Sequence, residues 1–140
     1  MPTVTVRHLT LVLLMVGCGA SGPSGLTQVP LGTWGGDDAG LIVSATEFHA
    51  HIGCTKGDGE GMIPLDAQGR YDVAGLYNVD AYPVDLGILH PARFLGSTDG
   101  QTLTLSVRLT DTGQTLGPVS LTLGRVPGMH VCPICRVPPR

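Results

Sequence analysis

Short stretches in which apolar and polar residues alternate recur along the chain, and no window carries the three-turn apolar stripe of an amphipathic helix. The clearest stretch is 102–109, where leucine or valine fills every second position. The stretch 118–125 shows a similar alternation after a turn at Asp111-Thr112-Gly113. Alternation at period two is typical of strands with one buried face. The two stretches therefore predict a β-hairpin.

The same pattern predicts eight strands with glycine- and aspartate-rich turns between most of them. The predicted strands are Thr33–Gly35, Leu41–Ala45, Glu47–Cys54, Met62–Asp66, Tyr71–Val79, Arg93–Ser97, Thr102–Leu109 and Pro118–Arg125. The predicted turns include Asp37–Gly40, Gly57–Gly61, Asp66–Gly69 and Asp99–Gly100. A sheet built this way must close on itself or pack against another sheet to protect its edges. We expect an all-β fold, a small antiparallel up-and-down β-barrel, with a β-sandwich as the alternative.

One predicted connection, Asp80 to Ala92, is longer than the others and contains two prolines. Long loops in compact β domains are often functional. The simpler interpretation is a surface loop that covers one end of the barrel. His90 lies in this loop and is a candidate site residue on the first interpretation.

The N-terminal segment has the organisation of a secretory signal, with Arg7 before the apolar run 9–16, which is too short to span a bilayer. Met15-Val16-Gly17-Cys18 resembles the lipobox of bacterial lipoproteins. That resemblance implies acylation of Cys18, with chains such as palmitate, and its conversion to the first mature residue. Gly19 is similar to the signal for outer-membrane sorting. Ordinary signal-peptidase cleavage after Ala20 is the alternative.

These features divide the chain of 140 residues into four parts. They are a lipoprotein signal peptide (1–17), a flexible tether rich in glycine, serine and proline (18–30), the β-barrel domain (31–136) and a disordered tail (137–140). The formal charge of −3 argues against nucleic acid or anionic headgroups as partners. We expect the domain in the periplasm or at the cell surface of a bacterial envelope, held to the membrane by lipid.

Gly32-Thr33-Trp34 resembles the G-x-W that opens the first strand of lipocalins and avidins. In lipocalin-like barrels this tryptophan packs beneath an arginine at the end of the last strand, and Arg125 stands at the matching place. The resemblance implies a calycin-type barrel closed by the pair Trp34 and Arg125. The other lipocalin motifs are absent. Avidin-type biotin sites use several tryptophans and this chain has one, so the resemblance extends to architecture and not to ligand.

With Cys18 acylated, three cysteines remain in a compartment that permits disulfides. A Cys54–Cys132 bridge would close a loop of about 79 residues, worth ~4.5 kcal/mol by loop-closure entropy. A Cys132–Cys135 bridge would contribute only ~2 kcal/mol. We expect Cys54–Cys132, with Cys54–Cys135 as the alternative.

The sequences His49-x-His51-x-x-Cys54 and His130-x-Cys132-x-x-Cys135 offer ligands suited to zinc or copper. On a strand, His49 and His51 would point to one face and Cys54 to the other, unless Gly53 forms a bulge. Beside the preferred disulfide, the candidate metal ligands are His49, His51, His130 and Cys135. The alternative is solvent-facing histidines next to a disulfide.

Three further motifs favour structural interpretations. Asp111-Thr112-Gly113 resembles the triplet of retroviral-type aspartic proteases but falls where a hairpin turn is needed. Cys132-Pro-Ile-Cys135 has redox spacing but is followed by a proline-rich tail instead of a helix. Asp58 and Glu60 lack the ligand series of a calcium-binding EF-hand loop and predict a glycine-rich turn.

The sequence predicts a non-enzymatic envelope lipoprotein whose barrel binds a protein or a small hydrophobic ligand. Binding of zinc or copper through the histidine and cysteine clusters is the alternative function. A hydrolytic enzyme comes third, because no nucleophile motif or phosphate loop is present.

Overall fold

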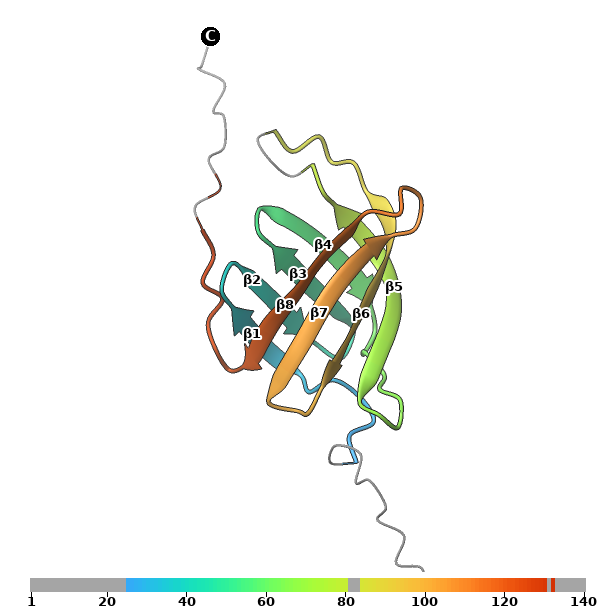
Figure 1. Ribbon diagram of the computed structural model, residues 1–140, viewed down its shortest axis with the longest axis vertical. Coiled ribbons are helices and arrows are strands. Elements are labelled where there is room, and N and C mark those ends of the chain that lie inside the picture. The colour runs from blue at the N-terminus through green and yellow to red at the C-terminus, as the bar shows by residue number, and fades with distance from the viewer. Residues whose placement is uncertain (1–24, 81–83, 131, 133–140) are drawn as a thin grey trace, which may run out of the picture.

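The computed structural model describes residues 25–80, 84–130 and 132. Each strand pairs antiparallel with the next in sequence, and the last returns to the first to close a barrel (Figure 1). The strands are β1 (Gly32–Gly36), β2 (Ala39–Val43), β3 (Glu47–Ile52), β4 (Thr55–Glu60), β5 (Arg70–Asn78), β6 (His90–Thr98), β7 (Thr102–Leu109) and β8 (Thr115–Leu123). The predicted all-β up-and-down barrel is confirmed, and the sandwich alternative is excluded.

Side chains from alternating strand positions fill the interior of the barrel. The four apolar residues that alternate along β7 are all buried, as predicted. The ring of Phe94 packs edge-to-face on Phe48 and on Tyr77, with centroid separations of 5.0 Å and 5.9 Å. Full burial of one such side chain stabilises the fold by about 1.5–3 kcal/mol. The interior is therefore a packed core.

The prediction of a strand at Met62–Asp66 is wrong. This segment lies outside the barrel strands and runs beside the residues that precede β1. Ile63 and Val29 are both buried against the barrel core, and the Val29 amide donates to the Ile63 carbonyl at 2.8 Å. The packed part of the chain therefore begins before residue 31, within the last residues of the segment expected to be a tether.

The fourth strand is instead β4, in the sequence predicted to form the turn Gly57–Gly61. Two of its inward positions, 57 and 59, are glycines. A Cβ at Gly57 would overlap the ring of Tyr77, and a Cβ at Gly59 would overlap the ring of Phe48. Aromatic rings thus fill the space that these two glycines leave, while charged side chains occupy the outward positions. The alternation of glycine with charged residues is the period-two pattern of a strand.

The segment after β8 crosses the β1–β2 turn. The Gly128 amide donates to the Gly36 carbonyl, and the Asp38 amide donates to the Gly128 carbonyl, both at 2.9 Å. Cys54 and Cys132 form a disulfide with their Cα atoms 5.6 Å apart, which is the preferred pairing from the sequence. The disulfide joins the C-terminal segment to the turn between β3 and β4.

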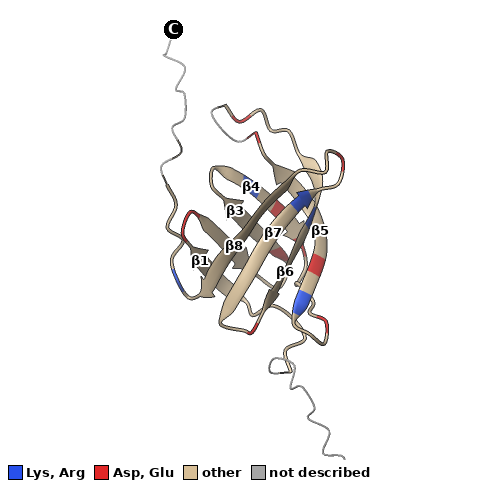
Figure 2. Cartoon of the chain, in the orientation of Figure 1, with Lys and Arg blue, Asp and Glu red and all other residues tan. Residues whose placement is uncertain are grey.

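Charged residues of both signs are scattered over the barrel without forming a continuous stretch of one sign (Figure 2). The point where the described chain begins and the loop 84–89 lie at opposite ends of the barrel (Figure 1). In the part of the chain that the structure describes, no helix has the length and apolar character needed to cross a membrane.

Candidate functional site

The outward side chains of β3 and β4 form a polar surface, here called the β3–β4 face. Their neighbours Phe48 and Ala50 are buried, so His49 and His51 point to the same outer face, as predicted. The register places three pairs of residues side by side on this face: Glu47 with Glu60, His49 with Asp58, and His51 with Lys56. Asp58 and Glu60 therefore lie on a strand, and their assignment to a turn is wrong.

His49 and His51 contact each other through their imidazole nitrogens. The two Nε2 atoms lie 2.8 Å apart, and the ring planes are inclined at 73°. On the other side of the His49 ring, Nδ1 lies 2.5 Å from Oδ1 of Asp58. Since a carboxylate accepts, Nδ1 of His49 carries the proton and its Nε2 accepts from His51. The three side chains form one hydrogen-bonded chain.

The protonation of His51 is shaped by its position in this chain. Burial lowers the pKa of His51 below its ordinary value of 6.5, and repulsion from His49, when that ring is protonated, and from Lys56 lowers it further. The carboxylate of Asp58 acts in the opposite direction. His51 is therefore neutral at pH 7.

A carboxylate from the loop 84–89 fixes that loop to the barrel wall. Oδ2 of Asp85 lies 3.0 Å from the Lys56 ammonium. Oδ1 accepts from the side-chain amide of Asn78 at 2.7 Å and from the backbone N–H of Gly87 at 2.8 Å. These hydrogen bonds, that of Lys56 foremost, lower the pKa of Asp85 to about 2. Asp85 is thus ionised at neutral pH and offsets the charge of Lys56.

The same loop presents apolar side chains to solvent. Val84, Leu86, Ile88 and Leu89 are exposed by 52%, 68%, 45% and 55%. Large apolar groups gathered at the surface mark interaction sites more often than isolated ones do. Because Asp85 fixes the base of the loop, these side chains are held at one end of the barrel.

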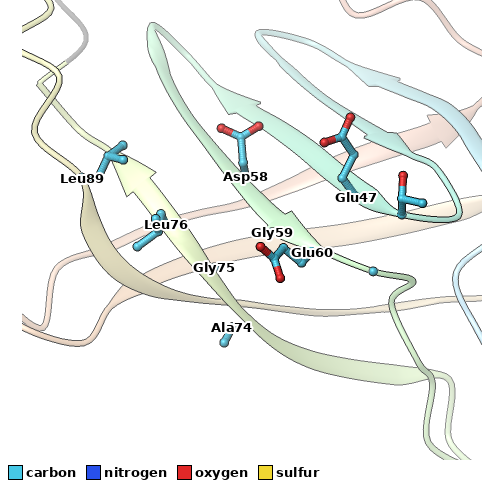
Figure 3. Close-up of a pocket in the computed structure, with 10 residues that line it drawn as sticks. Glu47, Asp58, Gly59, Glu60, Ala74, Gly75, Leu76 and Leu89 are labelled. Carbon is cyan, nitrogen blue, oxygen red and sulfur yellow. The ribbon is translucent and has the colours of Figure 1, made fainter.

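A groove opens in the barrel wall between β4 and β5. The β4–β5 ladder has three residue pairs and ends at Asp58–Leu76, whereas the β5–β6 ladder has eight. Beyond the last pair the strands diverge around a groove of about 1080 Å³ (Figure 3). Its lining comprises Thr46, Glu47, Asp58, Gly59, Glu60, Gly61, Ala74, Gly75, Leu76 and Leu89. The groove therefore combines three carboxylates with apolar side chains and contains no basic residue.

Trp34 and Arg125, the pair implied by the lipocalin resemblance, each have a polar partner among the described residues. Trp34 is fully buried, and its indole N–H donates to the Pro30 carbonyl at 3.1 Å. The Arg125 side chain is half-exposed and forms an ion pair with Asp37. The structure thus joins Trp34 to the segment before β1, and Arg125 to the β1–β2 turn.

The second predicted metal cluster is divided among other interactions. Cys54 and Cys132 are bonded to each other, and Nδ1 of His130 lies 3.0 Å from Oδ1 of Asp38. Cys135 lies outside the described residues. Within the described ranges, no group of three or more histidine, cysteine, aspartate or glutamate side chains is placed to hold a metal ion.

The remaining predicted residues take structural positions or lie outside the described chain. The Gly113 amide donates to the Leu109 carbonyl at 3.0 Å, which confirms the hairpin turn at 111–113. His90 begins β6 and so does not lie in the long loop as predicted, and its Nδ1 lies 2.7 Å from Oδ2 of Asp111, just beyond the neighbouring strand β7. Cys18 and the lipobox lie outside the described residues.

The sequence analysis missed the groove and its apolar rim. Two signals in the sequence point to them: the alternation of glycine and charge in 55–60, and four large apolar residues within 84–89. Comparisons with protein-family models, curated proteins and solved structures gave no match. The geometry of the groove and of the β3–β4 face is therefore the basis for a functional proposal.

Proposed function

We propose that this chain is a lipid-anchored, non-enzymatic binding protein of the bacterial cell envelope, whose barrel holds an extended segment of a partner protein in the β4–β5 groove. The observation that carries the proposal is the opening of the barrel wall beyond Asp58–Leu76, next to the apolar loop 84–89. The three β4–β5 pairs close the barrel, and beyond them the facing edges of the two strands have no ladder pairs with each other. Strand edges without ladder pairs are places where a partner strand can add.

The packed interior favours the wall over the barrel centre as the binding site. Trp34, Phe48, Tyr77 and Phe94 fill the interior and are each exposed by 1% or less. No buried side-chain polar atom among the described residues lacks a hydrogen-bond partner. Small eight-stranded barrels of this kind hold side chains or at most one small ligand. A protein segment on the wall is therefore a better occupant than a small hydrophobic ligand inside it.

The chemistry of the groove defines the kind of segment. Residues 59–61 and 73–75 face each other across the groove without ladder pairs between them, which suits the addition of an extended strand. The carboxylates of Glu47, Asp58 and Glu60 favour basic side chains on that strand. Leu76 and Leu89 favour apolar ones. We expect a segment in which basic and apolar residues alternate.

In this proposal the lipid anchor also determines which end of the barrel faces away from the membrane. Three acyl chains on Cys18 would hold the protein to a membrane permanently, whereas one chain would bind it only marginally. Because the described chain begins at the end of the barrel opposite the loop 84–89, such an anchor directs that loop away from the membrane. The negative formal charge gives no reason to expect nucleic acid as a partner.

The test uses the detergent-solubilised mature protein and a fluorescently labelled octapeptide of alternating lysine and valine, capped at both ends. Fluorescence anisotropy measures its affinity. We expect saturable binding that weakens with salt, and no binding of the matched peptide in which glutamate replaces lysine. Equal affinity for the two peptides, or no saturable binding of either, would contradict the proposal.

Two sets of variants locate the site. Leu86→Ser combined with Leu89→Ser should weaken binding at least about tenfold, because burying one leucine contributes about 1.5–3 kcal/mol. Val126→Ser is the matched control, since Val126 is 81% exposed and is not part of the groove. An equal loss of affinity in the control would place the peptide elsewhere.

A further inference from the structure

The β3–β4 face carries a second feature, which shares Asp58 with the groove but requires no bound partner. We propose that His49 and His51 chelate one Cu²⁺ ion through their Nε2 atoms, with Asp58 as the positioning residue for His49. Water completes the coordination of the ion.

The two imidazoles converge on one point of the face. Their Nε2 atoms are 2.8 Å apart, which is the length of the hydrogen bond that joins the rings in the metal-free protein. Two nitrogens bound to one ion at about 2.0 Å lie about 2.8–3.3 Å apart, so a small rotation of both rings opens a place for an ion. Cu²⁺ is the divalent ion that nitrogen sites bind most tightly, which favours copper over zinc.

Asp58 prepares His49 for this role. Histidines that bind metals almost always donate their other ring N–H to a carboxylate or carbonyl oxygen, which fixes the tautomer. Nδ1 of His49 has this partner in Oδ1 of Asp58, at 2.5 Å, so its Nε2 lone pair faces His51. In the metal-free protein the Nε2 proton of His51 fills the space between the rings. Copper replaces that proton, which returns to the same ring at Nδ1 through solvent, so no net proton is released.

The charges around the pair favour a cation. Glu47, Asp58 and Glu60 lie on the same face of the two strands. Lys56, the cationic side chain opposite His51, is paired with Asp85 at 3.0 Å, which offsets part of its charge. The His49 side chain is 36% exposed, which leaves the ion a path from solvent. A divalent ion therefore meets an accessible surface with an excess of negative charge.

The test titrates the detergent-solubilised mature protein with Cu²⁺ alone at pH 7.5, once with the wild-type sequence and once with Cys135→Ser, which removes the Cys135 thiol as a possible ligand. Electron paramagnetic resonance reports the ion and its nitrogen ligands. We expect one tightly bound Cu²⁺ per chain, with hyperfine splitting from two imidazole nitrogens. Zn²⁺ should bind more weakly than Cu²⁺. The wild-type spectrum requires no variant, so an absence of imidazole nitrogen, or tighter binding of Zn²⁺, would overturn the proposal.

Variants separate this site from other histidines. His51→Gln should abolish the two-nitrogen signal, and Asp58→Asn should weaken Cu²⁺ binding about 10–100-fold, the usual effect of losing an outer-shell carboxylate. His130→Gln is the matched control, because His130 also contacts an aspartate but lies outside the face. Retention of the signal in His51→Gln, or its loss in His130→Gln, would contradict the assignment. Neither result would affect the groove, since its test uses a peptide without metal.

Discussion

The ring of Phe48 occupies the space that a side chain at position 59 would need. A Cβ on Gly59 would overlap several atoms of the ring. Phe48 cannot move aside easily, because its other neighbour is the ring of Phe94 at a centroid distance of 5.0 Å. The contact therefore fixes the position of β4 beside the groove. It also explains why a glycine occupies a buried position of this strand.

Gly59→Ala should destabilise the barrel by about 1–3 kcal/mol, the usual cost of adding a group to a filled core. The measurement is the free energy of unfolding from urea denaturation. Gly128→Ala is the control, because a Cβ there would lie 3.5 Å from the Gly36 carbonyl oxygen, an ordinary contact. We expect its effect to stay within about 0.5 kcal/mol. Equal stability of the two variants would refute the contact described above.

The link between the loop 84–89 and the wall should respond to acid. The pKa of Asp85 is lowered from 3.8 to about 2, so its contribution to stability is complete above about pH 4 and is lost as the pH falls toward 2. The Gly87 amide donates to this carboxylate, so its NMR chemical shift should titrate with a midpoint near 2.

The same titration in a Lys56→Gln variant provides the control. Since the Lys56 hydrogen bond is the largest cause of the lowered pKa, the midpoint should move up toward 3.8. A midpoint near 3.8 already in the unsubstituted protein would show that Asp85 does not fix the loop.

Removing the disulfide should weaken the fold without abolishing it, because β1 and β8 close the barrel independently. Cys54→Ser combined with Cys132→Ser should lower the free energy of unfolding by about 4.5 kcal/mol, the loop-closure value for a separation of 78 residues. Cys135→Ser should leave stability unchanged. A comparable loss of stability in Cys135→Ser would indicate the alternative Cys54–Cys135 pairing, because the double variant removes Cys54 in either case.

The lipid anchor is tested by the intact mass of protein extracted from bacterial membranes. We expect a chain that begins at Cys18, carries three acyl chains and contains one disulfide. Cys18→Ser should leave the signal peptide attached and the lipid absent. A chain that begins at Ser21 would instead show ordinary secretion, and one that begins at Met1 would show that the N-terminal segment is not a signal.

The sequence predicts those parts of the fold in which the buried positions are filled by large apolar side chains. The hairpin of β7 and β8 is an example, because its inward positions are leucine and valine. The closed barrel followed from the number of strands and the short turns between them. The preferred disulfide followed from the length of the loop it closes.

The sequence misplaced β4 because its inward residues are glycines, whose burial depends on rings from distant strands. Gly57 and Gly59 have no apolar side chain to mark a buried face, and Tyr77 and Phe48 cover them only in the folded barrel. Ile63 was assigned to a strand because a short apolar segment between turns has the sequence pattern of a strand. In the structure it is buried, but beside the segment before β1. Local pattern cannot distinguish these cases.

The candidate site was predictable only in part. The two-residue spacing of His49 and His51 places both on one face, and the structure agrees. Their partner Asp58 was hidden by the turn assigned to its segment. The groove depends on where the β4–β5 ladder stops, which is a matter of register and not of any single residue.

The most direct test of the account is hydrogen exchange of the mature protein, alone and saturated with the lysine–valine octapeptide. If an extended segment binds in the groove, amides within 59–61 and 73–75 should exchange more slowly in the complex, and those of 84–89 should also gain protection. The rest of the barrel should be unchanged. Unaltered exchange at both strand edges while the peptide is bound, or protection confined to another surface, would contradict the proposed binding site.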